Sequence, residues 1–305
     1  MSIAAFLKLV EIQTKAASVI PFLLGTFYAA YRFDAFYPEH FLLMLISLLC
    51  IDMATTAINN YQDFKTARKR SGYGYERHNA IVSYQLSESS VQLTIVILLL
   101  LAASFGLLLV WRTDLIVLLA GVVSFLTGII YSAGPVPISR TPLGELVSGG
   151  CMGFIIPFLA VYIHVTQPPL IQATLSGALL NITANGGEIA RILLVSFPAA
   201  AAIANIMLAN NICDIAEDIE NRRYTLPVYI GRASSLNLFR LLYYSIYLLL
   251  AGLLLTGVLP LIAAITFASW PIVSGNIKLF CQLQTKRDTF VLAVKTLSPS
   301  TPLWP

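Results

Sequence analysis

The feature that most constrains this chain is a succession of apolar stretches, each roughly 18 residues or longer, that recurs along almost its whole length. A stretch of that length forms a helix long enough to cross the ~30 Å hydrocarbon core of a bilayer. A membrane β-barrel would show short alternating segments instead, so the pattern excludes one. Only 11% of the 305 residues are charged, whereas a soluble domain carries about 25%. The sequence therefore predicts an all-α polytopic membrane protein.

We expect eight complete spans, followed by a ninth that is truncated or atypical. The ninth would begin in TFVLAVKTL (289–297), where Lys295 and three later prolines end the apolar pattern. Pro, Gly, Asn and Thr in segment 166–189 favour a surface loop or a short interfacial helix. An apolar face along residues 3–10 predicts another interfacial helix before the first span. The eight expected spans cover residues 17–34, 41–62, 91–111, 114–132, 145–165, 190–211, 235–256 and 259–276.

The placement of Lys and Arg predicts the orientation in the membrane, because cytoplasmic segments carry an excess of basic residues. With the N-terminus inside, 16 of the 19 Lys and Arg residues lie on the cytoplasmic side, and Arg32, Arg112 and Arg191 lie outside. We therefore expect an integral membrane protein whose N-terminus and two Asp-rich loops, 59–90 and 210–234, are cytoplasmic.

A five-residue polar pattern, Asn-Asn-x-x-Asp, occurs twice in this apolar chain. It reads NNYQD at residues 59–63 and NNICD at residues 210–214, at the ends of the second and sixth expected spans. The repetition suggests two pseudo-repeats of about four helices within a single domain, residues 1–305. A site built from both copies would lie where the two halves meet.

The spacing places the oxygen-bearing side chains of each copy on one side of a helix. Asn59 and Asp63 are four residues apart, as are Asn210, Asp214 and Asp218. Charged residues near membrane depth usually face a bundle interior or a wet cavity. Asp and Asn oxygens suit Mg²⁺, which typically takes one or two carboxylates together with substrate phosphates and water. Two such helix ends could hold metal ions against one diphosphate from opposite sides.

Basic side chains follow both copies and would bind the anion, with Arg able to bind phosphate through two parallel hydrogen bonds. A simpler explanation is that water satisfies the Asp and Asn side chains and that the basic loops only follow the charge bias of membrane proteins. The presence of two copies in equivalent positions favours the diphosphate site. The expected substrate-binding residues are Asn59, Asn60, Lys65, Arg68, Arg77, Asn210, Asn211, Arg222 and Arg223.

Through these residues the chain resembles the UbiA superfamily of intramembrane aromatic prenyltransferases, and within it the enzymes that prenylate 1,4-dihydroxy-2-naphthoate in menaquinone synthesis. NNYQDFK (59–65) and NNICDIAEDIENRRYTLPVYIGR (210–232) resemble its two Asp-rich motifs. YSAGPVPISRTPLGEL (131–146) is similar to the family's segment between the fourth and fifth spans. The likeness extends over nearly the whole chain.

The resemblance implies a bundle of nine helical spans around a central cavity, with the Asp-rich loops at its cytoplasmic mouth. It also implies Mg²⁺-dependent ionisation of a polyprenyl diphosphate and attack by an electron-rich aromatic ring. In the naphthoate branch a carboxylate is lost and demethylmenaquinone is formed. The residues that match metal and diphosphate positions are Asn59, Asp63, Asp214 and Asp218. The expected catalytic residues are Asp63, Asp214, Asp218 and Tyr131.

Two departures affect the first motif. Asn60 stands where the family often has Asp, and no acid occurs in FKTARKR (64–70), where a further Asp is common. The first metal site therefore has fewer carboxylates than usual, and Asn60→Asp is expected to be tolerated or to raise Mg²⁺ affinity. Glu145 is a weaker catalytic candidate that could instead only cap a helix or pair, and His164 is expected to be an interfacial residue.

Alternative functions stay open at this level. The acceptor could be another aromatic, of the 4-hydroxybenzoate or homogentisate type. A transporter with an internal repeat would favour a site near the bilayer midplane, whereas these polar residues cluster at one face. Phosphatidyl transfer from CDP-alcohols would need an Asp-Gly-x-x-Ala-Arg run, which the sequence lacks. The expected partners are the bilayer, a polyprenyl diphosphate and an aromatic acceptor, with no nucleic acid and no obligate protein partner.

Overall fold

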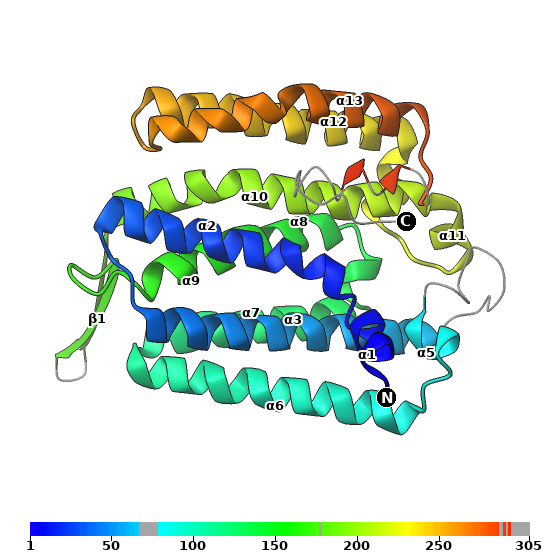
Figure 1. Cartoon of the computed structure of the whole chain (residues 1–305), viewed down its shortest axis with the longest axis horizontal. Helices are drawn as coiled ribbons and strands as arrows, with labels where there is room; N and C mark the ends of the chain where they lie inside the picture. Colours follow the sequence, from blue (N-terminus) through cyan, green and yellow to red (C-terminus); the bar gives the residue numbers. More distant parts are fainter. Residues whose placement is uncertain (67–78, 177–178, 287–288, 291, 294–305) are drawn as a thin grey trace.

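The computed structural model covers residues 1–305 and describes all of them except 67–78, 177–178, 287–288, 291 and 294–305. Most described residues are helical, as the sequence predicts, and the long helices run side by side along one direction (Figure 1). The first half contains α1 (Ile3–Leu9), η1 (Ile12–Lys15), α2 (Ala16–Phe33), α3 (Pro38–Thr66), α5 (Ala80–Ser83), α6 (Glu88–Arg112), α7 (Leu115–Ser132) and η2 (Ile138–Arg140). The second half contains α8 (Gly144–Gly150), η3 (Cys151–Ile155), α9 (Ile156–Tyr162), β1 (Ile171–Ser176), β2 (Leu179–Ala184), α10 (Gly186–Cys213), α11 (Ile215–Glu220), α12 (Leu226–Leu255), η4 (Leu261–Ser269) and α13 (Trp270–Gln282).

Seven helices in the described part of the chain are long and apolar enough to cross a membrane. They correspond to the second to eighth expected spans, with the fifth formed by α8, η3 and α9 and the eighth by η4 and α13. The first expected span is α2, which contains Pro21, two tyrosines and Arg32 and is not among the seven. The count of eight complete spans is therefore not confirmed. The expected ninth lies largely outside the described residues.

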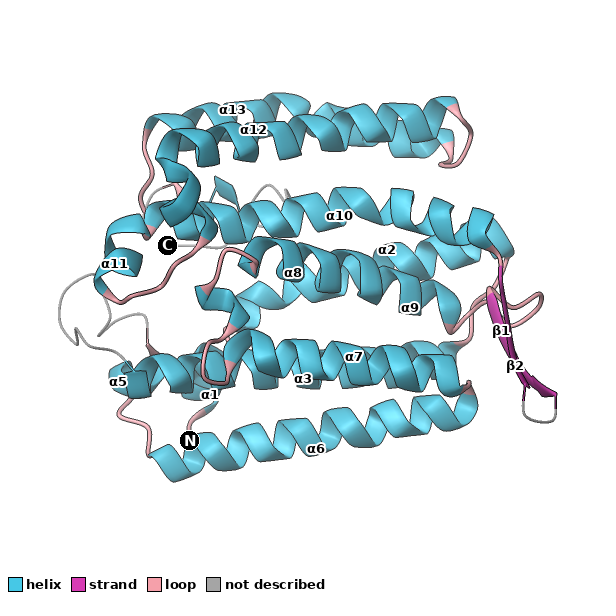
Figure 2. Ribbon diagram, turned by 180° about the vertical axis from the view of Figure 1, so that it is seen from behind, coloured by secondary structure: helices cyan, strands magenta, loops and turns pink. Residues whose placement is uncertain are grey.

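The helices form layers that Figures 1 and 2 show from opposite sides. In Figure 1, α12 and α13 lie above α10, and α3, α7 and α6 lie below α2. The helix α3 packs mainly on α6, and α10 packs mainly on α12. Close approach in the middle depends on glycine, because a Cβ at Gly25 would lie 2.4 Å from the Pro157 carbonyl oxygen, and one at Gly153 would lie 2.1 Å from the Ala200 Cα. These contacts hold α2, η3, α9 and α10 together around the centre of the bundle.

Segment 166–189 contains two strands, β1 and β2, so the expectation of a surface loop or a short interfacial helix is wrong for residues 171–176 and 179–184. The two strands form an antiparallel hairpin in which Ile171 pairs with Ala184 and Ser176 pairs with Leu179. The β-branched residues of its second strand, in LLNITA, favour an extended backbone, and the pairing satisfies the backbone of both strands. The hairpin projects from one end of the bundle (Figure 1).

In α1 and the residue after it, Ile3 and Leu7 of the expected apolar face are exposed, while Val10 of the same face and the adjacent Leu9 are fully buried against neighbouring helices. One further expectation changes on packing. His164 is not an interfacial side chain, since it is 0% exposed and its Nδ1 accepts a 3.1 Å hydrogen bond from the Tyr37 backbone N–H. Burial, together with the smaller effect of the nearby His40, lowers the pKa of His164 to about 4.

Candidate active site

Both copies of the repeated motif line one cavity of about 560 Å³ in the described part of the chain. Asn59 and Asp63 come from the last turns of α3, while Asn210 and Asp214 come from the end of α10 and its C-cap. These helix ends lie at the same end of the bundle as α5 and α11 (Figure 1). The structure thus brings side chains of both motif copies to one cavity.

In the first copy, the two asparagines have different surroundings. Asn59 lines the cavity. Asn60 also lines it, but its amide donates to the Leu9 carbonyl oxygen at 3.1 Å and to Glu11 Oε1 at 3.2 Å. Its own carbonyl oxygen accepts from the Asn79 amide at 2.9 Å. Asn60 therefore ties the N-terminal segment to α3, and its amide is already engaged by the protein.

In the second copy, Asp214 lines the cavity and is largely buried, while Asn211 and Asp218 do not line it. Asn211 is fully buried and donates to Glu145 Oε1 at 2.8 Å. Asp218 is 1% exposed, accepts a 2.8 Å hydrogen bond from the Thr225 hydroxyl and lies 3.3 Å from Arg223 Nε. Burial raises the pKa of Asp218 to about 6, although Arg223 and Thr225 act in the opposite direction.

The predicted basic residues are only partly brought to the cavity. Arg223 lines it, whereas Lys65 pairs with Glu88 at 2.5 Å and Arg222 is exposed and away from it. Arg68 and Arg77 lie outside the described residues.

Two basic side chains that were not predicted from the sequence also line the cavity, and each pairs with one of its carboxylates. Arg140 Nη2 lies 3.2 Å from Asp63 Oδ1, and Lys286 Nζ lies 2.6 Å from Asp214 Oδ2. Arg140 lies in segment 131–146, which resembles a segment of the family, so the sequence offered a reason to select it. No local pattern marks Lys286, because α13 brings it to the site from far along the chain.

Tyr131, in the last turn of α7, also lines the cavity, whose lining further includes apolar side chains such as Met152 and Ile203. A second polar group lines the wall opposite the motif of α10. Lys15 is 4% exposed and donates to Asp52 Oδ1 at 2.6 Å and to the Thr56 hydroxyl at 2.7 Å, and Ser18 donates to Asp52 Oδ2 at 2.6 Å. The cavity therefore has a charged mouth, an apolar interior and one satisfied ionic network in its wall.

The model of the UbiA prenyltransferase family matches residues 18–292, which is nearly the whole chain and includes every side chain placed above except those of the N-terminal segment. The chain belongs to this family. It is an integral membrane prenyltransferase, as the resemblance in its motifs implied. The bundle, with both motif copies on one cavity, is accordingly a UbiA-type bundle.

Known UbiA proteins resemble this one along almost their full lengths. A 1,4-dihydroxy-2-naphthoate octaprenyltransferase of Bacillus subtilis (strain 168) is 30% identical over 298 residues, covering 95% of this chain and 86% of that protein. The apo structure of a UbiA homolog from Aeropyrum pernix K1 superposes with a TM-score of 0.65 at 17% identity, over 97% of this chain and 95% of that one. A UbiA homolog from Archaeoglobus fulgidus bound to GPP and Mg²⁺ gives 0.63 at 14% identity, over 96% of each chain. The structural likenesses show the shared fold.

The donor set of this UbiA-family cavity fits a metal ion that is shared with a substrate. Within the described ranges, no three His, Cys, Asp or Glu side chains gather closely enough to hold a metal ion alone. Mg²⁺ is usually bound by one or two carboxylates, with phosphate oxygens and water completing its shell. Asp63 and Asp214, with the amide oxygens of Asn59 and Asn210, supply that kind of partial set around the cavity.

Proposed function

We propose that this enzyme transfers a polyprenyl group from a polyprenyl diphosphate to 1,4-dihydroxy-2-naphthoate. The diphosphate leaves the prenyl carbon, the carboxylate leaves as CO₂, and the product is the reduced, quinol form of demethylmenaquinone. The observation that carries the proposal is the meeting of the two Asn-Asn-x-x-Asp copies on one cavity. The acceptor is inferred from the Bacillus subtilis relative, whose name specifies that naphthoate.

The mouth of the cavity would bind the diphosphate. Asn59, Asp63, Asn210 and Asp214 would hold Mg²⁺, which when bound supplies Lewis-acid stabilisation of the charge on the departing diphosphate. Arg140, Arg223 and Lys286 would bind the same anion through charge-assisted hydrogen bonds. In the present structure Arg140 and Lys286 balance the acids, so these cations are in place to turn to the phosphate oxygens.

The interior would hold the prenyl chain and the reacting carbons away from water. Its wall includes Met152, Ile156, Ile203 and Met207, which cannot capture an electrophilic allylic carbon as water would. Tyr131 lines the same cavity from the last turn of α7, and we assign it to the reacting end of the substrates because its ring and hydroxyl can face developing positive charge.

We further propose that the motif end of the bundle is cytoplasmic in a bacterial cell membrane. The N-terminal helix α1 and both motifs lie at that end, and the basic residues follow them (Figure 1). Single Cys residues introduced at positions 175 and 224 of a Cys-less variant would be probed with a membrane-impermeant thiol reagent in intact cells. Position 175 should react and position 224 should not; the reverse result would invert the orientation.

The activity is tested with membranes containing the enzyme, Mg²⁺, a polyprenyl diphosphate and each of three acceptors: dihydroxynaphthoate, 4-hydroxybenzoate and homogentisate. We expect a prenylated, decarboxylated product from the naphthoate, identified by mass, and its loss when the metal is chelated. Arg112→Gln is a matched control, because Arg112 pairs with Glu39 away from the cavity. A product from only one of the other acceptors would show that the proposed acceptor is wrong. The absence of product with all three acceptors would contradict the proposed prenyl transfer.

A further inference from the structure

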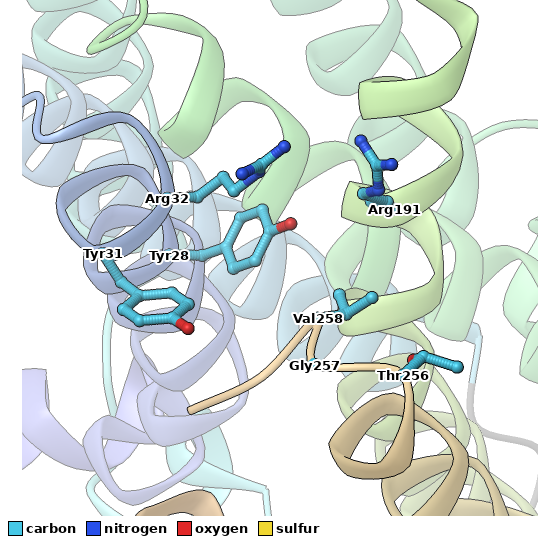
Figure 3. Close-up of a pocket in the computed structure, with 7 residues that line it drawn as sticks. All are labelled: Tyr28, Tyr31, Arg32, Arg191, Thr256, Gly257 and Val258. Atoms are coloured by element: carbon cyan, nitrogen blue, oxygen red, sulfur yellow. The ribbon is translucent and has the colours of Figure 1, made fainter. Parts of the chain in front are cut away.

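A second pocket, of about 460 Å³, is drawn in Figure 3, and it lies near the start of α10, at the end of that helix opposite to the second motif. It is formed by the last turns of α2, the first turns of α10 and the turn after α12. Its lining residues are Tyr28, Tyr31, Arg32, Arg191, Thr256, Gly257 and Val258. It shares no lining residue with the motif cavity, so prenyl transfer does not account for it.

The pocket carries an excess of positive charge. Arg32 and Arg191 both bind one carboxylate, that of Glu188, with Arg32 Nη2 lying 2.7 Å from Glu188 Oε1. Two guanidinium groups against one carboxylate leave a net charge of about +1, and each side chain stays 44% exposed toward the pocket mouth. These are two of the three basic residues that the charge bias of the chain placed outside, which makes their convergence informative. The third, Arg112, is paired with Glu39 elsewhere.

A buried hydroxyl points into the same space. Tyr28 is 4% exposed, and its hydroxyl has no hydrogen-bond partner among the residues that the structure describes. Figure 3 shows this hydroxyl directed into the gap between Arg32 and Arg191. A buried polar group without a partner is costly, so such a group facing a pocket points to a ligand that would complete its bonding.

We propose that this pocket binds a phosphate group, with Arg32 and Arg191 as charge partners and the Tyr28 hydroxyl as a third donor. The phosphate could belong to the headgroup of an anionic phospholipid or be free in solution. The pocket lies at the level where helices end, and the neighbouring Leu255 is 89% exposed and Phe27 67% exposed, so acyl chains could continue along the helices below a bound headgroup. Guanidinium groups can bind a phosphate through paired, charge-assisted hydrogen bonds, which suits this pair of arginines to such a headgroup.

The test uses the purified full-length protein in a neutral detergent and phosphate-free buffer, titrated with three probes and followed by native mass spectrometry and by Tm. The probes are dioleoylphosphatidylglycerol, dioleoylglycerol and inorganic phosphate. We expect dioleoylphosphatidylglycerol to bind and raise Tm, and dioleoylglycerol, which has the same chains without phosphate, to do neither. If inorganic phosphate also binds, the phosphate group alone is sufficient for binding. If inorganic phosphate does not bind while the phospholipid does, the site is specific for the lipid.

Variants separate binding from folding. Tyr28→Phe removes only the unpartnered hydroxyl, so without ligand its Tm should equal or exceed that of the parent, while its affinity for the bound probe falls about tenfold. Arg191→Gln should weaken binding at least as much, and the control Arg112→Gln should leave it unchanged. The proposal is overturned if neither phosphate probe binds, or if Tyr28→Phe binds both as the parent does.

Discussion

Lys286 Nζ lies 2.6 Å from Asp214 Oδ2, and this ion pair joins the segment after α13 to the second motif at the end of α10. Asp214 is largely buried, and Lys286 supplies the charge that balances its carboxylate. The segment that follows the last long helix therefore takes part in the mouth of the cavity, where a diphosphate would arrive.

Removing this cation should weaken diphosphate use. Lys286→Gln is expected to lower kcat/KM for the polyprenyl diphosphate about tenfold or more, since a charge-assisted hydrogen bond contributes about 1.5–3 kcal/mol. The matched control is Lys278→Gln, an exposed lysine on α13 that does not line the cavity. Equal kcat/KM values for the two variants would show that Lys286 does not contribute to diphosphate binding.

The two acids of the second motif should respond differently to replacement. Asp218→Ala deletes the buried acceptor of Thr225 and Arg223, so we expect a loss of about 2 kcal/mol of unfolding free energy in addition to any loss of activity. Asp214→Ala frees Lys286, which is 38% exposed and can be hydrated, so stability should change little while prenyl transfer is lost. Thermal unfolding and a transfer assay on both variants check this; similar Tm losses would contradict the division of roles.

Asn60→Asp should destabilise the protein, contrary to what the family pattern alone predicts. The Asn60 amide donates to the Leu9 carbonyl oxygen and to Glu11 Oε1, and a carboxylate would face these two oxygens without a proton to share. The expected cost is about 1–3 kcal/mol. Asn59→Asp is the matched control, because Asn59 faces the cavity. A parental Tm for Asn60→Asp, with a lower Mg²⁺ requirement, would restore the pattern-based expectation.

His164 should make stability fall in acid. Its pKa is about 4 in the folded protein, below the ordinary value of 6.5, so the unfolded state binds more protons between these values. Stability from the neutral imidazole is present above pH 6.5 and is lost as pH falls toward 4, by about 2 kcal/mol at pH 5. His164→Gln should flatten the fall in Tm between pH 7 and pH 5. An unchanged slope would show that His164 does not titrate in this way.

Much of this architecture could be predicted from the sequence, because apolar length fixes membrane helices and a repeated motif at equivalent helix ends fixes a shared site. The spacing placed Asn59 with Asp63 and Asn210 with Asp214, and all four line the cavity. Helical spacing alone does not predict that the helix breaks at Asp214. Because of this break, Asp218 lies on the separate helix α11, and its side chain accepts a hydrogen bond from Thr225.

The other differences come from contacts between distant segments. Asn211 faces Glu145 and Asp63 faces Arg140, and no local pattern specifies either partner. The Pro, Gly, Asn and Thr residues of segment 166–189 favour a surface loop or a short interfacial helix, yet pairing of two six-residue strands decides the structure. Lys286 was missed for the same reason, since it reaches Asp214 only through the packing of α13 on α12 and η4.

The central claim is that the two motif copies act on one diphosphate, and a double-mutant cycle on diphosphate binding tests it most directly. Binding of a radiolabelled polyprenyl diphosphate in Mg²⁺, without acceptor, would be measured for the parent, Asp63→Asn, Asp214→Asn and the double variant. If both carboxylates serve one metal-bound diphosphate, the free-energy losses should be non-additive by about 0.5–3 kcal/mol, with the double variant binding little worse than the weaker single one. Strictly additive losses, or parental binding by either single variant, would contradict a shared site.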